Sequence, residues 1–208
     1  MENKEENIII ENNNLFIKRL ELEDAFNIKS WGRHNNKLFI DYDLAKYNQR
    51  ELKIWYYSKK SGIRNKYFAV YDYNNNFIGY IGIKDINIFK KSSTLGIVLN
   101  PNFMSKGYGY SIMKLFLNYY FNELNMKRMN LDVNEFNERA IKLYKKLGFR
   151  YVSEYLGMFE NQDIDFEDID YMGYKDNFVI NNGIIYSRIY IMTLDYRRYK
   201  LKEQYDEI

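Results

Sequence analysis

The chain has 208 residues, and 46% of them are hydrophobic, which is enough for one domain with a substantial core and excludes a disordered chain. The sequence contains no cysteine, which excludes disulfides, a thiol nucleophile and a cysteine metal site, and its one histidine, His34, cannot make a zinc site alone. A net charge of +3 is too weak to indicate a nucleic-acid partner. No apolar run is long enough to span a bilayer, and residues 1–7 do not resemble a signal peptide, so we expect a cytoplasmic protein without a membrane partner.

The first half of the chain predicts a strand, two helices and a hairpin. A strand is expected at residues 15–20, and a helical pattern with acidic residues in its first turn follows at residues 21–31. A second helix is expected at residues 48–59. Strands at residues 67–73 and 77–86 flank three asparagines, which tolerate the left-handed conformation of a tight turn.

The organising segment is residues 95–121. The run LGIVL at residues 95–99 predicts a buried strand, and Asn100-Pro101 ends it. A glycine-containing turn then leads into a helix with an apolar face, made of Ile112, Leu115, Phe116, Tyr119 and Tyr120.

This strand, turn and helix together favour an anion site. The first turn of a helix has N–H groups without intrahelical partners, and the helix dipole adds partial positive charge there. Gly107 and Gly109 allow a phosphate to approach the backbone, and Lys106 adds a full charge. The alternative is an ordinary strand-to-helix turn.

The second half predicts further strands around one helix. A strand is expected at residues 128–133, and Asn134 or Asn137 caps a helix that buries one face and ends at Gly148. Further strands are expected from residue 149 to 152 and from 184 to 193. Between them, residues 160–170 hold six acidic residues and no basic one. This acidic run is either a solvated loop or a negative rim that attracts a cationic ligand.

Two motifs give the chain a resemblance to a known family. The segment from Met104 to Gly109 is similar to the coenzyme loop Gln/Arg-x-x-Gly-x-Gly/Ala of the GNAT acyl-CoA-dependent N-acyltransferases. The family's later signature matches Asn137, Ala140, Tyr144 and Gly148-Phe149. The resemblance implies a single-domain α/β fold with a mixed, mostly antiparallel sheet, a locally parallel, splayed strand pair and helices on both faces. We expect this domain at residues 15–195, after an N-terminal extension at residues 1–14 and before a charged tail at residues 196–208.

The resemblance also implies an activity. The expected reaction is direct transfer of the acetyl group of acetyl-CoA to a primary amine, namely a peptide N-terminus, a polyamine or another small amine. Dimers are common in the family, so a homodimer is also expected. The residues expected to bind the coenzyme are Ile97, Val98 and Leu99 through their main chain, Met104, Ser105, Lys106, Gly107, Tyr108, Gly109 and Tyr110 of the loop, and Asn137 and Lys146. The side chains of the three strand residues are expected in the core.

The same resemblance assigns the remaining roles. Tyr144 is the candidate general acid, because ordinary phenol and thiol pKa values make proton transfer to the leaving thiolate nearly balanced. The alternative for Tyr144 is packing alone, and for Asn137 it is helix capping alone. Trp31, Arg33 and His34 are expected to line the acceptor pocket, the alternative being a core tryptophan and two surface residues.

Two positions depart from the family pattern. Met104 stands where the family prefers Gln or Arg, and Thr94 stands where members often carry a glutamate base. We therefore expect Thr94 to hold a water that relays the proton. The alternative proton acceptors are the carboxylates Asp85 and Glu135. The alternative function is a catalytically inactive, CoA-binding or interaction module of the same fold. A third class, suggested by mild basicity and 22 tyrosines, is a nucleic-acid or protein interaction domain.

Overall fold

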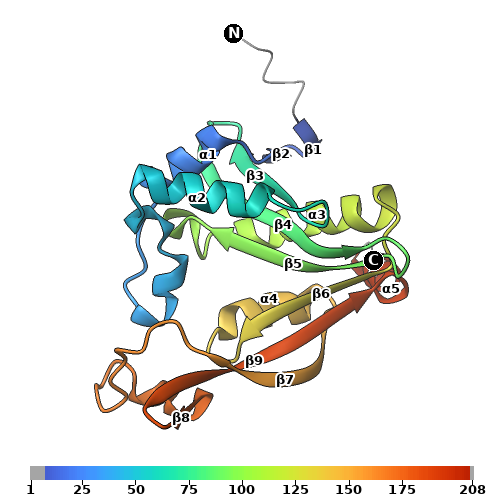
Figure 1. The fold of residues 1–208 in the computed structure, drawn as a ribbon. Coiled ribbons are helices and arrows are strands. Elements are labelled where there is room, and N and C mark those ends of the chain that lie inside the picture. Colours follow the sequence, from blue (N-terminus) through green and yellow to red (C-terminus); the bar gives the residue numbers. More distant parts are fainter. Residues whose placement is uncertain (1–7, 207–208) are drawn as a thin grey trace. The chain divides into compact units, whose positions relative to one another are not determined.

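The computed structural model describes residues 8–206, which divide into two units (Figure 1). The first unit contains the described residues up to 33 and residues 43–129, and the second contains residues 34–42 and the described residues from 130 on. The residue limits predicted for a single domain stay a prediction. Among the described residues, no helix has both the length and the apolar character needed to cross a membrane.

The first unit is built on an antiparallel sheet. Its strands follow one another in chain order, as β1 (Ile8–Glu11), β2 (Leu15–Arg19), β3 (Lys66–Asp72), β4 (Phe77–Asn87) and β5 (Ser92–Leu99). The predicted asparagine turn joins β3 and β4: Asn75 has a left-handed φ of 61°, and the Asp72 carboxylate accepts the N–H groups of Asn74 and Asn76. The predicted asparagine turn is therefore confirmed, and hydrogen bonds to the Asp72 side chain, which were not predicted, stabilise it.

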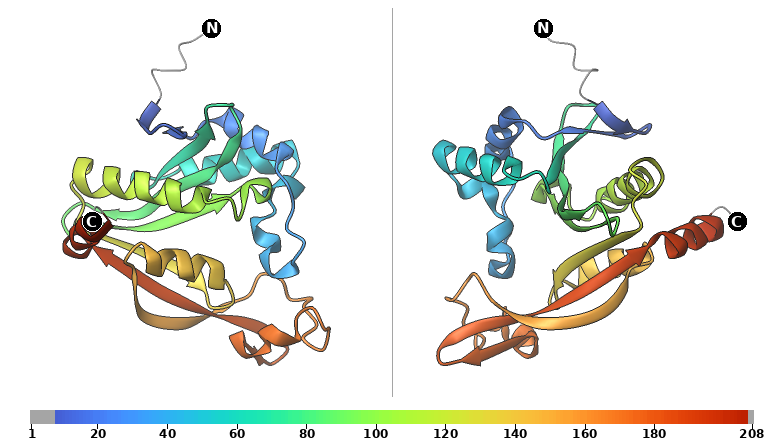
Figure 2. Two further views of the ribbon diagram at one scale, coloured as in Figure 1. Left: turned by 180° about the vertical axis from the view of Figure 1, so that it is seen from behind. Right: turned by 45° about the vertical axis from the view of Figure 1, so that its right-hand side comes forward.

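Helices cover both faces of this sheet. They are α1 (Leu22–Asn27), α2 (Gln49–Lys60) and α3 (Tyr108–Asn118), with 3₁₀ segments at Ile28–Ser30, Leu44–Lys46 and Pro101–Phe103. Ala25 of α1 and Tyr56 of α2 share a core cluster with Ala69 of β3. Phe116 of α3 instead contacts Phe68, the neighbouring residue on β3, with ring centroids 5.6 Å apart. Because neighbouring strand residues point to opposite faces, α1 and α2 cover one face and α3 covers the other (Figures 1 and 2).

The buried face of α3 is wider than its sequence pattern predicted. Ile112, Phe116 and Tyr120 are buried as expected, and Met113 and Leu117 are buried beside them. Leu115 and Tyr119, also on the predicted apolar face, are only half-buried. The helix continues as a π-turn over Tyr119–Glu123, which shifts the later residues around the axis relative to a regular helix.

The second unit places a long strand at the centre of a smaller sheet. Strand β9 (Ile184–Asp195) lies between β6 (Arg128–Asn134) and β7 (Arg150–Met158), and β8 (Phe178–Asn181) also pairs with β9. The pairs of β9 with β7 and β8 are antiparallel. Helices α4 (Glu138–Lys146) and α5 (Tyr196–Asp206) belong to this unit, as do 3₁₀ segments at Lys37–Tyr42 and Met172–Asn177. One apolar cluster of this unit contains Leu38, Phe136, Phe159, Ile164, Phe166, Tyr171, Phe178 and Ile185.

Three elements were not predicted from the sequence. The segment predicted as an N-terminal extension contains β1, because its isoleucines pair with β2. The segment predicted as a charged tail forms α5. Strand β8 joins β9 through Asn182 and Gly183, both with positive φ, which is the conformation that this dipeptide favours in a hairpin.

Candidate active site

Strand β5 carries the residues expected to bind the coenzyme through their main chain. It pairs on one side with β4, placing Ile97 opposite Ile81 and Leu99 opposite Gly79. The side chains of Ile97, Val98 and Leu99 are half-buried, and of these Val98 packs against the core cluster that contains Trp31 and Tyr80, so their expected place in the core is met only in part. A Cβ atom added to Gly96 would meet no described atom within 4 Å, so the backbone there has room for a neighbouring group.

The loop after β5, which is predicted to bind an anion, contains two residues with positive φ. Ser105 has a φ of 60°, and Gly107, the N-cap of α3, has a φ of 84°. The Gly107 carbonyl accepts the N–H groups of Tyr110 at 3.1 Å and Ser111 at 3.2 Å, which closes the first turn of the helix. The left-handed conformation explains why glycine stands at this N-cap. A Cβ atom on Gly107 would also touch nothing within 4 Å.

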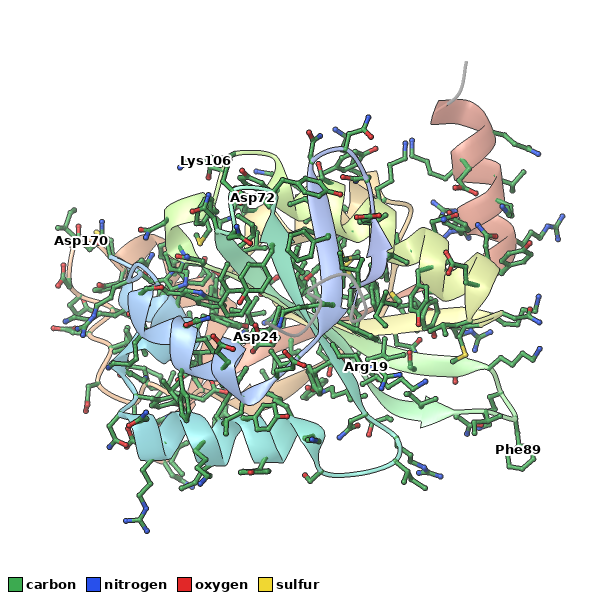
Figure 3. All side chains as sticks on the ribbon, turned by 90° about the horizontal axis from the view of Figure 1, so that it is seen from above. Arg19, Asp24, Asp72, Phe89, Lys106 and Asp170 are labelled. Atoms are coloured by element: carbon green, nitrogen blue, oxygen red, sulfur yellow. The ribbon has the colours of Figure 1, made fainter. Side chains whose placement is uncertain are left out.

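The charged part of the loop lies at the surface. Ser105, Lys106 and Gly107 are exposed, whereas Met104, Tyr108, Gly109 and Tyr110 are half-buried. Figure 3 labels Lys106 in this loop. The Lys106 ammonium lies 5.4 Å from the centre of the Phe103 ring. An exposed cation beside a helix N-terminus is suited to an anionic ligand such as a pyrophosphate.

A buried asparagine fixes the segment expected to bind the acceptor. The Asn100 side-chain oxygen accepts the N–H of Gly32 at 3.1 Å. Trp31 is 5% exposed and packs on Phe77, with ring centroids 5.0 Å apart. The alternative that Trp31 is a core residue is therefore confirmed, and Arg33 is exposed as that alternative expected. Sequence reasoning missed Asn100, because its partner lies 68 positions away.

His34 belongs to the second unit and is half-buried, not a surface residue. Its ring stacks on Phe39, with centroids 5.6 Å apart, and lies 6.4 Å from the ring of Tyr42. The role of His34 in acceptor binding stays a prediction.

The residues considered for proton removal have different surroundings. Thr94 is half-buried on β5 opposite Lys84 of β4, next to the irregular register where Asp85 adopts a φ of 55°. Asp85 is exposed. Glu135, in the second unit, accepts the Tyr190 hydroxyl and lies 3.6 Å from the Arg188 Nε, so it is engaged in an ion pair. Of the two carboxylates, Asp85 is the more accessible, because Glu135 is already engaged by Arg188 and Tyr190.

Helix α4 contains the predicted general acid. Tyr144 is 8% exposed, and its ring lies 5.8 Å from that of Phe149. Burial raises the pKa of the Tyr144 hydroxyl above its ordinary value, and the nearby Tyr42 phenol adds to the rise. Tyr144 therefore keeps its proton at neutral pH, but transfer to a thiolate is less balanced than ordinary pKa values predicted. Lys146, also a predicted coenzyme ligand, is exposed in the last turn of α4.

The acidic run folds around apolar side chains. Ile164 and Phe166 are buried, whereas the six acidic residues of the run are exposed. The Asp165 and Asp168 carboxylates accept the N–H groups two residues ahead, at 2.9 Å and 3.0 Å. The run is thus an ordered loop with an exposed negative surface, which leaves both of its predicted roles open.

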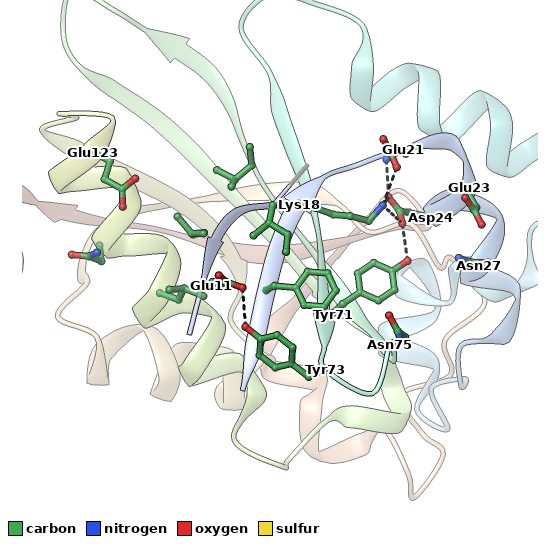
Figure 4. A pocket seen from close by; sticks show the side chains of 16 residues that line it. Glu11, Lys18, Glu21, Glu23, Asp24, Asn27, Tyr71, Tyr73, Asn75 and Glu123 are labelled. Carbon is green, nitrogen blue, oxygen red and sulfur yellow. Dashed lines mark hydrogen bonds and ion pairs between the residues drawn. The ribbon is translucent and has the colours of Figure 1, made fainter. Parts of the chain in front are cut away.

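A cavity of about 1200 Å³ lies elsewhere in the first unit, between β1, β2, β3, α1 and α3 (Figure 4). Lys18 pairs there with Asp24 at 2.9 Å and with Glu21 at 3.0 Å, and the Tyr71 hydroxyl donates to Asp24 at 2.7 Å. None of the residues predicted for coenzyme or acceptor binding lines this cavity. Within residues 8–206, no group of three or more histidine, aspartate or glutamate residues is arranged to hold a metal ion.

The chain is similar in sequence to a known domain family and to known enzymes. A family model described as an acetyltransferase (GNAT) domain matches residues 14–150. The spermidine N(1)-acetyltransferase of Vibrio cholerae serotype O1 is 26% identical over 138 residues, which cover 66% of this chain and 80% of that protein. The spermidine N(1)-acetyltransferase of Escherichia coli strain K12 is 32% identical over 81 residues, covering 39% and 44% of the two chains.

The fold also matches solved structures. The crystal structure of spermidine N-acetyltransferase from Vibrio cholerae in complex with CoA and spermine has a TM-score of 0.67 and 23% identity, with 91% of this chain and 99% of that chain covered. This likeness shows the fold, and it confirms the predicted α/β fold class.

Proposed function

Because the chain belongs to the GNAT acetyltransferase family, and so transfers an acetyl group from acetyl-CoA to an amine, we propose that its acceptor is a small polycationic amine of the polyamine class. The observation that carries this proposal is the likeness to the spermidine N(1)-acetyltransferase of Vibrio cholerae over 80% of that protein's length. The inactive-module alternative is not supported, because the family model and the similar proteins are acetyltransferases.

The exposed acidic run supports a cationic acceptor. Residues 160–170 present six carboxylates, of which Glu167 is paired with Lys175 at 2.7 Å. A negative surface raises the local concentration of a polycation and speeds its encounter with the protein, and added salt screens this effect. A peptide N-terminus carries a single cationic amine and gains less from such a surface.

The coenzyme is proposed to bind along β5 and the loop that follows it. The backbone groups of Ile97, Val98 and Leu99 would pair with the amide groups of the coenzyme arm, and the loop around Gly107 would hold its phosphates. The left-handed φ of Gly107 and the exposed Lys106 support the second assignment.

The chemistry requires two proton movements. The acceptor nitrogen attacks as a neutral amine, the new C–N bond forms and the C–S bond breaks, and the amine proton leaves through water. We assign Thr94 to hold that water and Tyr144 to donate a proton to the leaving thiolate. The raised pKa of Tyr144, caused by its burial, supports its presence as a protonated donor.

Release of free CoA thiol with a panel of amines tests the proposed acceptor. The panel contains spermidine, spermine, an aminoglycoside and a peptide with a free N-terminus, and each is measured at low salt and after addition of about 200 mM salt. We expect the highest kcat/KM with spermidine or spermine and a decrease with salt for these two. A peptide preferred over every polycation, with no salt effect, would contradict the proposal.

The location and the oligomeric state of the protein are further proposals. We propose that the protein is cytoplasmic, where acetyl-CoA is available, and that it forms a homodimer, as is common in this family. Cell fractionation tests the first, and sedimentation of the purified chain tests the second.

A further inference from the structure

Asn100 connects two segments of the first unit that are far apart in the sequence. The residue is 4% exposed and directly follows β5. Its side-chain nitrogen donates to the Phe77 carbonyl of β4 at 3.2 Å. Its side-chain oxygen accepts the N–H groups of Gly32 and Asn102, each at 3.1 Å. One buried amide thus links β4, the turn after β5 and the segment at Gly32.

This connection requires an amide side chain. The Asn100 backbone N–H donates to the Ile78 carbonyl at 2.9 Å, so the main chain is held by the same strand, β4. The side chain then needs a donor for the Phe77 carbonyl and an acceptor for two N–H groups, and an amide supplies both. Aspartate supplies only the acceptor, and alanine supplies neither.

The partner segment approaches closely. A Cβ atom on Gly32 would lie 2.3 Å from the side-chain oxygen of Asn102 and 3.2 Å from its backbone nitrogen. Trp31, the preceding residue, packs on Phe77 and Tyr80. Gly32 is therefore fixed by its own hydrogen bond and by the packing of its neighbour, and the exposed Arg33 follows from this fixed point.

We propose that Asn100 is a positioning residue for the amine acceptor. It touches no reacting atom and acts through Gly32, by holding the segment that leads to Arg33 against the end of β5. The inference rests on the proposed function, in which the coenzyme lies along β5, and on the sequence-based expectation that Arg33 lines the acceptor pocket. Loss of the side chain then loosens the acceptor segment and leaves the coenzyme strand, which is held by its pairing with β4, in place.

The test compares Asn100→Ala with Asn102→Ala, a matched change in the same turn that keeps the backbone N–H accepted by Asn100. Hydrogen exchange at the Gly32 amide reports the connection directly. We expect exchange to become about tenfold faster in Asn100→Ala and to change little in Asn102→Ala. The acceptor KM should rise about fivefold in Asn100→Ala, while the acetyl-CoA Kd stays within about twofold of the unmodified chain.

Asn100→Asp separates the hydrogen bond that the side chain accepts from the one that it donates. Because it keeps an oxygen for the Gly32 N–H, its KM for the amine should lie between those of Asn100→Ala and the unmodified chain. Thermal unfolding checks that each variant is folded. Equal acceptor KM in Asn100→Ala and the unmodified chain, or unchanged exchange at Gly32, would overturn the inference while the proposed function stands. An unmodified chain that acetylates no amine would instead overturn the proposed function, and the inference with it.

Discussion

The side-chain oxygen of Asn137 accepts the backbone N–H of Ala140 at 3.2 Å and so caps α4. Capping is one reason for an asparagine at this position, and it uses the side-chain oxygen. The other predicted role of Asn137 is to bind the coenzyme arm. The side-chain nitrogen remains available for that contact, so the two roles can be tested separately.

Substitution of Asn137 separates these roles. Asn137→Asp keeps the oxygen that caps the helix and removes the amide nitrogen, whereas Asn137→Ala removes both. We expect Asn137→Ala to lower the free energy of unfolding by about 1 kcal/mol and Asn137→Asp to change it little. Both variants should weaken acetyl-CoA binding in calorimetry. Asn137→Asp with unchanged coenzyme binding would limit Asn137 to helix capping.

Tyr144→Phe tests the general acid. The ring contact with Phe149 is kept, so we expect unchanged thermal stability and an acetyl-CoA Kd within about twofold, but a kcat about 100-fold lower. Burial raises the pKa of Tyr144, so the hydroxyl stays protonated as pH rises, and the unmodified enzyme should show no loss of kcat from this group between about pH 8 and 10. A coenzyme affinity that falls as much as kcat would refute the assignment.

Neutralising the acidic run tests its proposed role toward the acceptor. In the triple variant with Asp163→Asn, Asp165→Asn and Asp168→Asn, the asparagine oxygens can still accept the N–H groups that order the loop. We expect the KM for spermidine to rise about threefold and its salt dependence to weaken, with a smaller effect on a monoamine acceptor. If the triple variant and the unmodified chain have equal KM values for spermidine, the acidic run is a solvated loop with no role in acceptor binding.

Asp24 is predicted to be a stability residue that does not affect coenzyme binding. Its carboxylate is 2% exposed and interacts with Lys18, with the Tyr71 hydroxyl and with the Glu21 N–H. Asp24→Ala leaves Lys18 without its buried partner, so we expect a loss of about 3 kcal/mol in urea unfolding at neutral pH. Tyr71→Phe removes one hydrogen bond to a charged group and should cost about 1.5 kcal/mol.

The pH dependence of this network has a defined sign. Burial lowers the pKa of Lys18, but the charge and hydrogen bonds of Asp24 and Glu21 outweigh burial, so the pKa is raised above 10.5. The ion pair therefore contributes fully at neutral pH, and its contribution is lost as pH rises through the raised lysine pKa. A stability difference between Asp24→Ala and the unmodified chain that is lost already at about pH 8 would contradict this assignment.

Features set by local chemistry could be predicted from the sequence. The asparagine turn before β4 and the cap at Asn137 each depend on a few neighbouring residues. Of the four residues that helical spacing predicted to be buried in and just after α4, Ile141, Tyr144 and Leu147 are buried, whereas Ala140 is only half-buried.

Features that depend on distant partners could not be predicted in this way. The bond from Asn100 to Gly32 joins segments 68 positions apart, and no spacing in the sequence indicates it. The pairing of β1 with β2 and the half-burial of Val98 depend on which elements become neighbours. The raised pKa of Tyr144 likewise results from burial, which a single sequence does not specify.

Titration of acetyl-CoA into the purified chain by calorimetry tests the central claim most directly, with Gly107→Glu and Gly107→Asn as paired variants. Asparagine tolerates the left-handed conformation of Gly107, whereas glutamate places a negative charge at the proposed phosphate site. We predict micromolar binding to the unmodified chain, binding to Gly107→Asn weakened by less than about tenfold, and no measurable binding to Gly107→Glu. Absence of binding to the unmodified chain, or equal binding to the chain and to Gly107→Glu, would contradict the assignment of this loop to the coenzyme.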